Sequence, residues 1–365
     1  MHGFRRRLLC RLLPLPRPEG WWGAVRTGEQ GEIVLLGHGS GGTLTHRLVK
    51  TVFQEAFENP ILDEMLDAAL LDLPHGRIAF TTDSFVVDPI FFPGGDIGKL
   101  AVCGTVNDLA VSGAKPLYIS AAFIIEEGFP LADLRQIVGS MREAALAAGV
   151  HVVTGDTKVV GRGSADKIFI NTTGIGIIPE GCCLSPRRIK SGDAVIVSGS
   201  LGEHGLAILA RREGLSFTTP VVSDCAPLHR LAAAILAAGG EGVRCMRDPT
   251  RGGLATTLNE LAAQSGKGIL IQEELLPVRR EVAGGCEMLG IDPLYLANEG
   301  KIVAVAAPGV APRVLEAMRS LPEGREAVQI GRVIEEEPGL VLIETELGAT
   351  RILTMLEGEP LPRIC

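Results

Sequence analysis

Ile78-Ala79-Phe80-Thr81-Thr82-Asp83-Ser84-Phe85 is a largely apolar stretch interrupted by one acidic residue near its end. Its first five residues predict a β-strand, because Ile, Phe and Thr are enriched in strands. Asp83 follows directly after that strand. The same arrangement, a strand or helix that gives way to a carboxylate beside small residues, recurs along the chain. It indicates an α/β (α+β) protein that carries its polar chemistry at the ends of its elements.

Strand-like and helical patterns alternate in two cycles of similar size, which predicts two α+β units joined near residues 180–190. In the first cycle we expect strands at 68–71, 78–82, 85–87, 150–153 and 168–170, and helices at 99–111 and 131–148. In the second we expect strands at 194–197, 302–305 and 340–343, and helices at 206–212, 228–238 and 254–263. The predicted domains are 31–182 and 183–353, followed by a mobile tail at 354–365.

Residues 1–30 differ from the rest of the chain. They contain Arg5-Arg6-Arg7 and both tryptophans, Trp21 and Trp22. Their apolar run is too short for a secretory signal, and no small-residue cleavage site follows it. We interpret this segment as an extension outside the fold, either disordered or the product of a start assigned too far upstream.

Composition excludes several classes of function. The net charge is −8 over 365 residues, and no basic stripe with interleaved aromatics is present, which argues against a nucleic-acid binder. No apolar run approaches the length that spans a bilayer, so no membrane association is expected. The eight cysteines include no C-x-x-C pair, which argues against structural zinc and favours a reducing cytoplasm.

Five aspartates lie beside small residues, where a strand or helix gives way to open backbone, and together they predict a metal site. Magnesium takes hard oxygen ligands and bridges carboxylates to phosphate oxygens. For any single aspartate a helix cap or turn explains the residue equally well, but the set of five favours the metal. They are Asp67, Asp83, Asp108, Asp156 and Asp248.

The run Gly37-His38-Gly39-Ser40-Gly41-Gly42 precedes a helical pattern. Such a run can present consecutive backbone N–H groups to a phosphate. It is neither a P-loop nor a dinucleotide fingerprint, because the defining residues are absent. On its own it is more typical of a flexible turn.

The chain ends in Pro360-Leu361-Pro362-Arg363-Ile364-Cys365. Two prolines favour extended backbone, so the segment predicts an exposed, semi-rigid arm that carries a thiol. A frayed end that happens to carry a cysteine is the alternative.

Taken together, these motifs resemble the HypE family of carbamoyl dehydratases, which act in nickel–iron hydrogenase maturation. That family lies within the aminoimidazole ribonucleotide synthetase-like (PurM-like) ATP-binding superfamily. The resemblance covers roughly residues 33–365. The glycine and aspartate motifs are shared across the superfamily, whereas the proline-arginine-apolar-cysteine ending is specific to the family. The resemblance is carried by 37–42, 81–85, 104–110, 154–158, 248–253, 297–301 and 362–365.

The resemblance implies a two-domain PurM-like fold that forms a homodimer through its N-terminal domain, with an ATP cleft beside the interface, a C-terminal α/β domain and an extended tail. ATP and Mg²⁺ are the implied cofactors. A partner carbamoyltransferase, HypF, would load a carbamoyl group onto the tail thiol. ATP-dependent dehydration would turn it into a thiocyanate, and the cyano group would pass to iron on the HypC–HypD complex.

Under the same resemblance each candidate residue takes a role. Cys365 is the acceptor, Glu299 is the general base with His38 as a second candidate, and Lys158 neutralises charge on the transferring phosphoryl group. Nucleotide or substrate contacts are expected from Gly39, Ser40, Gly41, Gly42, Asn107, Asp156 and Asn171. Magnesium ligands are expected at Asp67, Asp83, Asp108 and Asp248.

Two other functions are compatible with parts of the pattern. A small-molecule ATP-dependent kinase or synthetase of the same superfamily would share every aspartate motif but would not need Cys365. A non-catalytic carrier scaffold would use the thiol but would show no ATP hydrolysis when carbamoylated.

Overall fold

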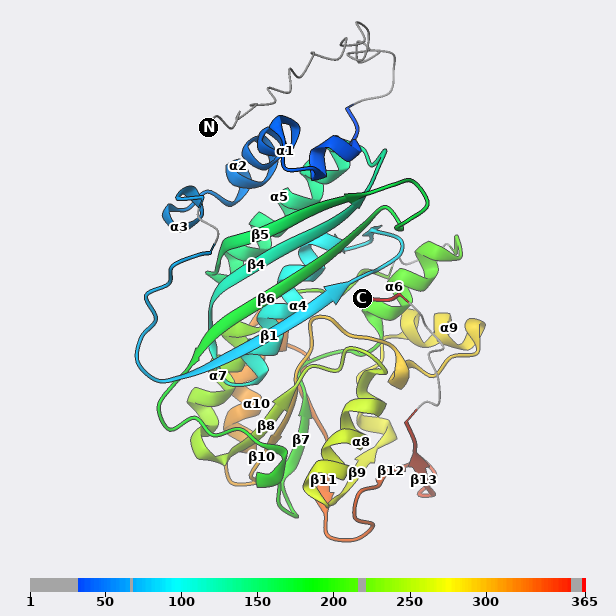
Figure 1. Cartoon of the computed structure of the whole chain (residues 1–365). Coiled ribbons are helices and arrows are strands. Elements are labelled where there is room, and N and C mark those ends of the chain that lie inside the picture. The colour runs from blue at the N-terminus through cyan, green and yellow to red at the C-terminus, as the bar shows by residue number, and fades with distance from the viewer. Residues whose placement is uncertain (1–31, 66–67, 216–220, 356–362) are drawn as a thin grey trace, which may run out of the picture.

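The computed structural model describes residues 32–65, 68–215, 221–355 and 363–365. Figure 1 shows two sheets, one above the other, each with its own helices. The predicted extension at 1–30 lies outside the described residues.

The first sheet has four strands in the order β1-β6-β4-β5. β6 is antiparallel to β1 and β4, and β4 is parallel to β5. Its strands are β1 (Arg77–Phe85), β4 (Lys115–Glu126), β5 (His151–Val160) and β6 (Ile168–Ile178), and a short separate pair is formed by β2 (Phe91–Phe92) and β3 (Gly95–Asp96). The helices of this half are α1 (Thr43–Leu48), α2 (Glu55–Phe57), α3 (Pro60–Asp63), α4 (Ile97–Val111) and α5 (Leu131–Ala148).

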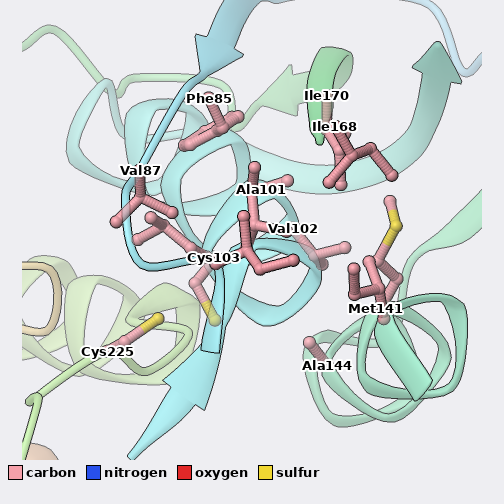
Figure 2. Close-up of a cluster of buried hydrophobic side chains, with 14 of the residues drawn as sticks. Phe85, Val87, Ala101, Val102, Cys103, Met141, Ala144, Ile168, Ile170 and Cys225 are labelled. Carbon is pink, nitrogen blue, oxygen red and sulfur yellow. The ribbon is translucent and has the colours of Figure 1, made fainter. Parts of the chain in front are cut away.

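Helices α4 and α5 cover one face of this sheet (Figure 1). Thirteen of the fifteen residues of α4 are buried, so this helix is enclosed on all sides and its sequence is apolar almost throughout. Figure 2 shows side chains from these elements interdigitating in the core, among them Phe85, Ala101, Val102, Met141 and Ile170. No described element covers the opposite face, where Ile78, Phe80 and Ile124 are exposed.

The second sheet has seven strands in the order β13-β12-β9-β11-β7-β10-β8. The strands are β7 (Ala194–Val197), β8 (Val243–Arg247), β9 (Gly268–Gln272), β10 (Val303–Ala306), β11 (Val328–Ile334), β12 (Val341–Glu344) and β13 (Thr350–Leu353). The helices are α6 (Glu203–Arg212), α7 (His229–Gly239), α8 (Gly253–Ser265), α9 (Arg280–Leu289) and α10 (Ala311–Arg319).

Both faces of this sheet are covered. Val195 and Val197 of β7 pack in the cluster that contains α8, whereas Ala194 and Ile196 pack with α7 and α10. Successive residues of a strand point to opposite faces, so a strand buried on both faces is a continuous apolar run. This is why Ala-Val-Ile-Val was recognisable as a strand.

Helix α6 belongs to the second half in sequence, yet Leu206, Ile208 and Leu209 pack in the core of the first half. Asn107 of α4 joins the halves as well, because its side chain binds backbone groups at Ala226, Leu228 and Glu299. These contacts fix the two halves around the region between them.

Two predictions of local structure are wrong, and one long strand was not predicted. Residues 68–71 form no strand, and Phe85 closes β1 instead of opening a separate strand at 85–87. Strand β4 was not predicted, for two reasons. Its Pro116 lies beside a register shift, and its Ser120-Ala121-Ala122 segment has low strand propensity.

None of the helices in the described residues is both long and apolar enough to cross a bilayer.

Candidate active site

Three of the predicted aspartates meet between the two sheets, and we call them the acidic cluster. Asp83 lies two residues before the end of β1, and Asp108 lies in the last turn of α4. Asp248 follows directly after β8. All three line the same two cavities. The fold therefore brings together three aspartates that lie far apart in the sequence.

The position of the acidic cluster makes its carboxyl groups harder to ionise. Burial, followed by the charge of the neighbouring Asp108 carboxylate, raises the pKa of Asp83 to about 6. Burial likewise raises the pKa of Asp248 to about 7, again with a contribution from Asp108. Thr81 Oγ1 donates a 2.7 Å hydrogen bond to Asp108 Oδ2. Crowded carboxylates of this kind are stabilised in the ionised form by a cation placed among them.

The donor set suits magnesium that is shared with a phosphate. In the part of the chain that the structure describes, no group of three or more His, Cys, Asp or Glu side chains is arranged as a ready-made metal site. Asp67, the fourth predicted ligand, lies outside the described residues. Magnesium commonly uses one or two carboxylates together with phosphate oxygens and water, which the acidic cluster can supply.

The two cavities differ in size and in lining. The wide cleft has a volume of about 700 Å³ and is bordered by Arg77, Phe80, Arg247 and Arg251. The narrow channel has a volume of about 140 Å³ and is bordered by Phe85, Gly104, Glu299 and residues 363–365. The acidic cluster, Thr250 and Arg251 border both. A molecule in the cleft and a group in the channel would therefore meet at the acidic cluster.

The end of the tail is docked in the channel. The Val86 N–H donates to the Cys365 carbonyl at 3.2 Å, and the Asp88 N–H donates to the Arg363 carbonyl at 3.2 Å. Ile364 is only 5% exposed and Cys365 packs against the core of the first half. The exposed arm expected from the prolines is thus wrong for 363–365, because an apolar side chain and paired backbone groups hold this segment inside the protein.

Glu299 is buried at the channel and is placed by its own backbone. The Glu299 N–H donates to Asp224 Oδ1 at 3.0 Å, and Asn107 Nδ2 donates to the Glu299 carbonyl at 3.1 Å. Burial, followed by the charges of Asp248 and Asp224, raises the pKa of Glu299 well above its usual range. A carboxylate in such a place is a stronger base than an exposed one.

Asn107 is placed differently from its predicted role as a nucleotide contact. Its Nδ2 donates to the carbonyls of Ala226 and Glu299, and its Oδ1 accepts from the Leu228 N–H. Only 1% of the residue is exposed. Its amide is therefore engaged by protein groups and links the two halves.

A second group of predicted residues lies on the uncovered face of the first sheet. Asp156 is in the middle of β5, not at its end, and pairs with Lys158 at 3.2 Å while both side chains are largely exposed. Asn171 of β6 donates to the Asp83 carbonyl at 2.8 Å and to Ser84 Oγ at 3.0 Å. The register places Asn171 and Asp156 on either side of Ala122, in one row across the sheet. None of the three lines the cleft or the channel.

The glycine run lies beside this second group. His38 lies in the 3₁₀ turn Leu36–Gly39, where its Nδ1 accepts from the Leu35 N–H at 2.9 Å. Burial lowers the pKa of His38. Gly39 lies so close to β5 that a side chain there would meet the Val159 nitrogen at 2.5 Å. The run, which includes the predicted phosphate contacts Ser40, Gly41 and Gly42, lines neither the wide cleft nor the narrow channel.

Several residues at the site were not singled out from the sequence. Arg251 borders both cavities and stands in the same motif as Asp248, so the motif was the available signal. Arg77 of the cleft and Asp224, which places Glu299, carried no motif. Their roles depend on contacts between segments far apart in the chain.

Comparison with known proteins adds a family. Residues 65–178 match the N-terminal domain and residues 190–343 the C-terminal domain of AIR synthase related protein. Carbamoyl dehydratase HypE of Bradyrhizobium diazoefficiens is 54% identical over 330 residues, which are 90% of this chain and 95% of the relative.

Two solved structures are similar over most of their length. A crystal structure of hydrogenase maturation protein HypE in complex with ATP is 51% identical with a TM-score of 0.88, covering 91% of this chain and 99% of that chain. A crystal structure of a HypE–HypF complex is 53% identical with a TM-score of 0.75, covering 85% of this chain and 99% of that chain. The chain therefore belongs to the HypE family of carbamoyl dehydratases, and the two-domain PurM-like α/β fold predicted from its sequence is confirmed.

Proposed function

We propose that this protein catalyses the ATP-dependent dehydration of a carbamoyl group carried on the Cys365 thiol. The reaction converts an S-carboxamide to an S-cyanate, which supplies the cyanide ligand for the iron of a nickel–iron hydrogenase. One observation carries the proposal: Cys365 and the acidic cluster border the same narrow channel, and the acidic cluster also borders a wide cleft.

The wide cleft is the proposed site of ATP. Its volume is in the range of ordinary small-molecule sites, and Arg77, Arg247 and Arg251 on its wall are suited to phosphate groups. Family membership at 51% identity to a protein crystallised with ATP supports the assignment.

The chemistry begins at the carbamoyl oxygen, which is a poor leaving group. Transfer of the γ-phosphoryl group of ATP to this oxygen gives ADP and an O-phosphorylated intermediate as one N–H proton is lost. Cleavage of the C–O bond then releases phosphate, the second N–H proton leaves, and the remaining S–C≡N unit stays on Cys365. The oxygen of the lost water thus leaves in phosphate.

Glu299 is the proposed base for the nitrogen-bound protons. It borders the channel together with Cys365, and burial raises its pKa, which makes its carboxylate a stronger base than an exposed one. His38 does not line the channel and contacts Leu35 instead. Glu299 is therefore the better candidate for the general base.

Asp83, Asp108 and Asp248 would hold magnesium, which would neutralise charge on the phosphate oxygens. The docked tail lines the channel with Ile364 and Cys365, which leaves only a narrow space beside the thiol. A narrow channel limits the access of water to the activated intermediate, and the tether makes the reaction intramolecular.

A homodimer would complete the site. We propose that residues 31–182 form the dimerisation domain and 183–353 the second domain. The uncovered sheet face carries exposed apolar side chains, including Ile78 and Phe80, and such a face is typical of a protein interface. Asp156 and Lys158 lie on that same face, so dimerisation through it would bring them toward the partner's cleft. Lys158 would there neutralise phosphoryl charge.

Two further partners follow from the family. The related HypE–HypF complex supports a carbamoyltransferase of the HypF type as the donor of the carbamoyl group. We propose a HypC–HypD complex as the acceptor of the cyano group and the cytoplasm as the location.

Intact-mass spectrometry tests the function. The protein is incubated with carbamoyltransferase, carbamoyl phosphate and ATP, and wild type is compared with Cys365→Ala. We expect a carbamoyl adduct on wild type only, followed by ATP-dependent loss of the mass of one water. Cys183→Ala, which removes a thiol exposed elsewhere, is the matched control and should behave as wild type. An unmodified wild type beside an active transferase would overturn the proposal in favour of a small-molecule kinase.

A further inference from the structure

Helix α6 contacts the docked tail from the second half of the molecule. His204, in its first turn, lies 2.9 Å from the Ile364 carbonyl through Nε2. Arg212, its last residue, donates through Nη2 to the Arg363 carbonyl at 2.8 Å. The two residues are eight positions apart in the sequence, which places their side chains about two turns apart and close to the same face of the helix. The tail therefore runs along α6 toward its N-terminus.

The His204 contact has a defined direction. A carbonyl oxygen only accepts hydrogen bonds, so Nε2 carries the proton. In the neutral ring Nδ1 then accepts from the hydroxyl of Ser223, 2.7 Å away. The Ser223 oxygen in turn accepts from the Cys225 N–H at 3.1 Å. His204 is completely buried and lies edge-on to Phe92, so its ring is held in one orientation that aims Nε2 at the tail.

Arg212 links the tail to the first half. Besides the Arg363 carbonyl, its guanidinium donates to the Asp88 carbonyl through Nε at 3.0 Å and Nη2 at 2.6 Å. Asp88 itself donates its N–H to the Arg363 carbonyl. On the same side Arg363 Nε donates to the Val86 carbonyl at 2.9 Å. The tail is thus held between α6 and residues 86–88 by main-chain groups.

We propose that His204 and Arg212 are positioning residues that hold the end of the tail against α6 and thereby keep Cys365 at the acidic cluster. They bind the consecutive carbonyls of the two residues that precede Cys365, so losing either side chain removes one attachment of the tail next to the thiol. Ser223 supports the arrangement by fixing the His204 ring. The consequence for catalysis rests on the proposed dehydratase function, whereas the docking itself does not.

The test measures docking without chemistry. Full-length protein is treated with an excess of a maleimide, and peptide mass spectrometry follows labelling of Cys365 against the exposed Cys183 in the same molecules. Losing one buried hydrogen bond changes a local opening equilibrium by about tenfold. We therefore expect His204→Ala and Arg212→Ala each to accelerate Cys365 labelling about tenfold, with Cys183 unchanged. His204→Gln, which keeps a donor, should restore part of the protection.

Arg211→Ala is the matched control. Arg211 is the exposed neighbour of Arg212 on the same helix, and the substitution removes the same charge as Arg212→Ala. Labelling at the wild-type rate in folded Arg212→Ala, or equal acceleration by Arg211→Ala, would overturn the proposal. If His204→Ala does not fold, Arg212→Ala decides, because its side chain is only half-buried.

Catalysis gives a second readout. Both variants should accept the carbamoyl group from the transferase at least as fast as wild type, since loading needs an accessible thiol, and should lose water more slowly, because the loaded tail is docked in a smaller fraction of the molecules. Accelerated labelling with no dehydration even in wild type would uphold the docking role and count against the proposed function alone.

Discussion

The wide cleft and the narrow channel are both bordered by the acidic cluster but differ in the other residues that line them. The cleft is about 700 Å³ and is bordered by arginines from β1, β8 and the loop after β8. The channel is about 140 Å³ and is lined on one side by the end of the chain itself, residues 363–365. A mobile, highly charged ligand needs an open site with many donors, whereas a tethered group needs only a lined path.

The difference indicates a division of work. Residues that border only the cleft should affect the binding of ATP, and residues that border only the channel should affect the fate of the carbamoyl group. Residues of the acidic cluster border both and should affect both. Each prediction below tests whether the two regions are separable in this way.

The largest effect is expected from Glu299→Gln, which changes the channel alone. Removing a general base costs typically 10²- to 10⁴-fold in rate, so ATP-dependent loss of water from the carbamoylated protein should slow by about that amount. The KM for ATP should stay within about twofold, since a residue that makes no contact with a ligand contributes little to its binding. Single-turnover mass spectrometry gives the rate and the dependence on ATP.

Folding provides the control for this variant. The Glu299 backbone bonds to Asp224 and Asn107 are kept, and Gln has the same shape and cannot ionise beside Asp248 and Asp224. Thermal stability should therefore equal or exceed that of wild type. A rate equal to wild type would show that another group removes the protons.

The contrast between the two regions also explains what the sequence could reveal. Four residues of the site each stand in a short motif with glycine or small neighbours, and the sequence alone predicts them as site residues. They are Asp83, Asp108, Asp248 and Glu299. By contrast, His204, Arg212 and Asp224 lie in ordinary-looking segments. Their importance comes from contacts over more than seventy residues of chain, which no local pattern encodes.

The fold shows the same limit. Elements with strong periodicity were predicted closely: α5 was expected at 131–148 and spans Leu131–Ala148, and β7 was expected at 194–197 and spans Ala194–Val197. β4 was missed because its partly buried outer face and small residues blur the alternation. α9 was missed as well, because two glycines interrupt its apolar pattern and glycine weakens a helix in isolation.

A smaller effect is expected on the other side of the acidic cluster. Arg77→Ala removes a guanidinium that borders the cleft but not the channel. Loss of one charged hydrogen bond to a ligand weakens binding by about tenfold or somewhat more, so the KM for ATP should rise by that factor. The rate of water loss at saturating ATP should be unchanged, because the channel is intact.

Arg187→Ala is the matched variant for this test. Arg187 is an exposed arginine next to Pro186 of the cleft wall, but it does not border the cleft. Its KM should equal that of wild type. A slower rate at saturating ATP in Arg77→Ala would contradict the separation of the two regions.

The smallest effect concerns pH and the tail-binding ring of His204. Burial lowers the pKa of His204 below 6.5, against an opposing effect of the Asp224 charge. The unfolded chain therefore takes up a proton that the folded protein resists, and the stability supplied by the neutral ring is present above pH 6.5 and lost as the pH falls below it. Urea unfolding between pH 7.5 and 5.5 should show wild type losing more stability than His204→Gln, by at most about 1.4 kcal/mol per pH unit for one proton.

The buried carboxyls at Asp83, Asp248 and Glu299 have raised pKa values and change stability in the opposite direction. Because they are present in both proteins, they cancel in the difference. Equal pH slopes would show that the ring accepts a proton inside the fold, and the tail would then be held by a charged histidine.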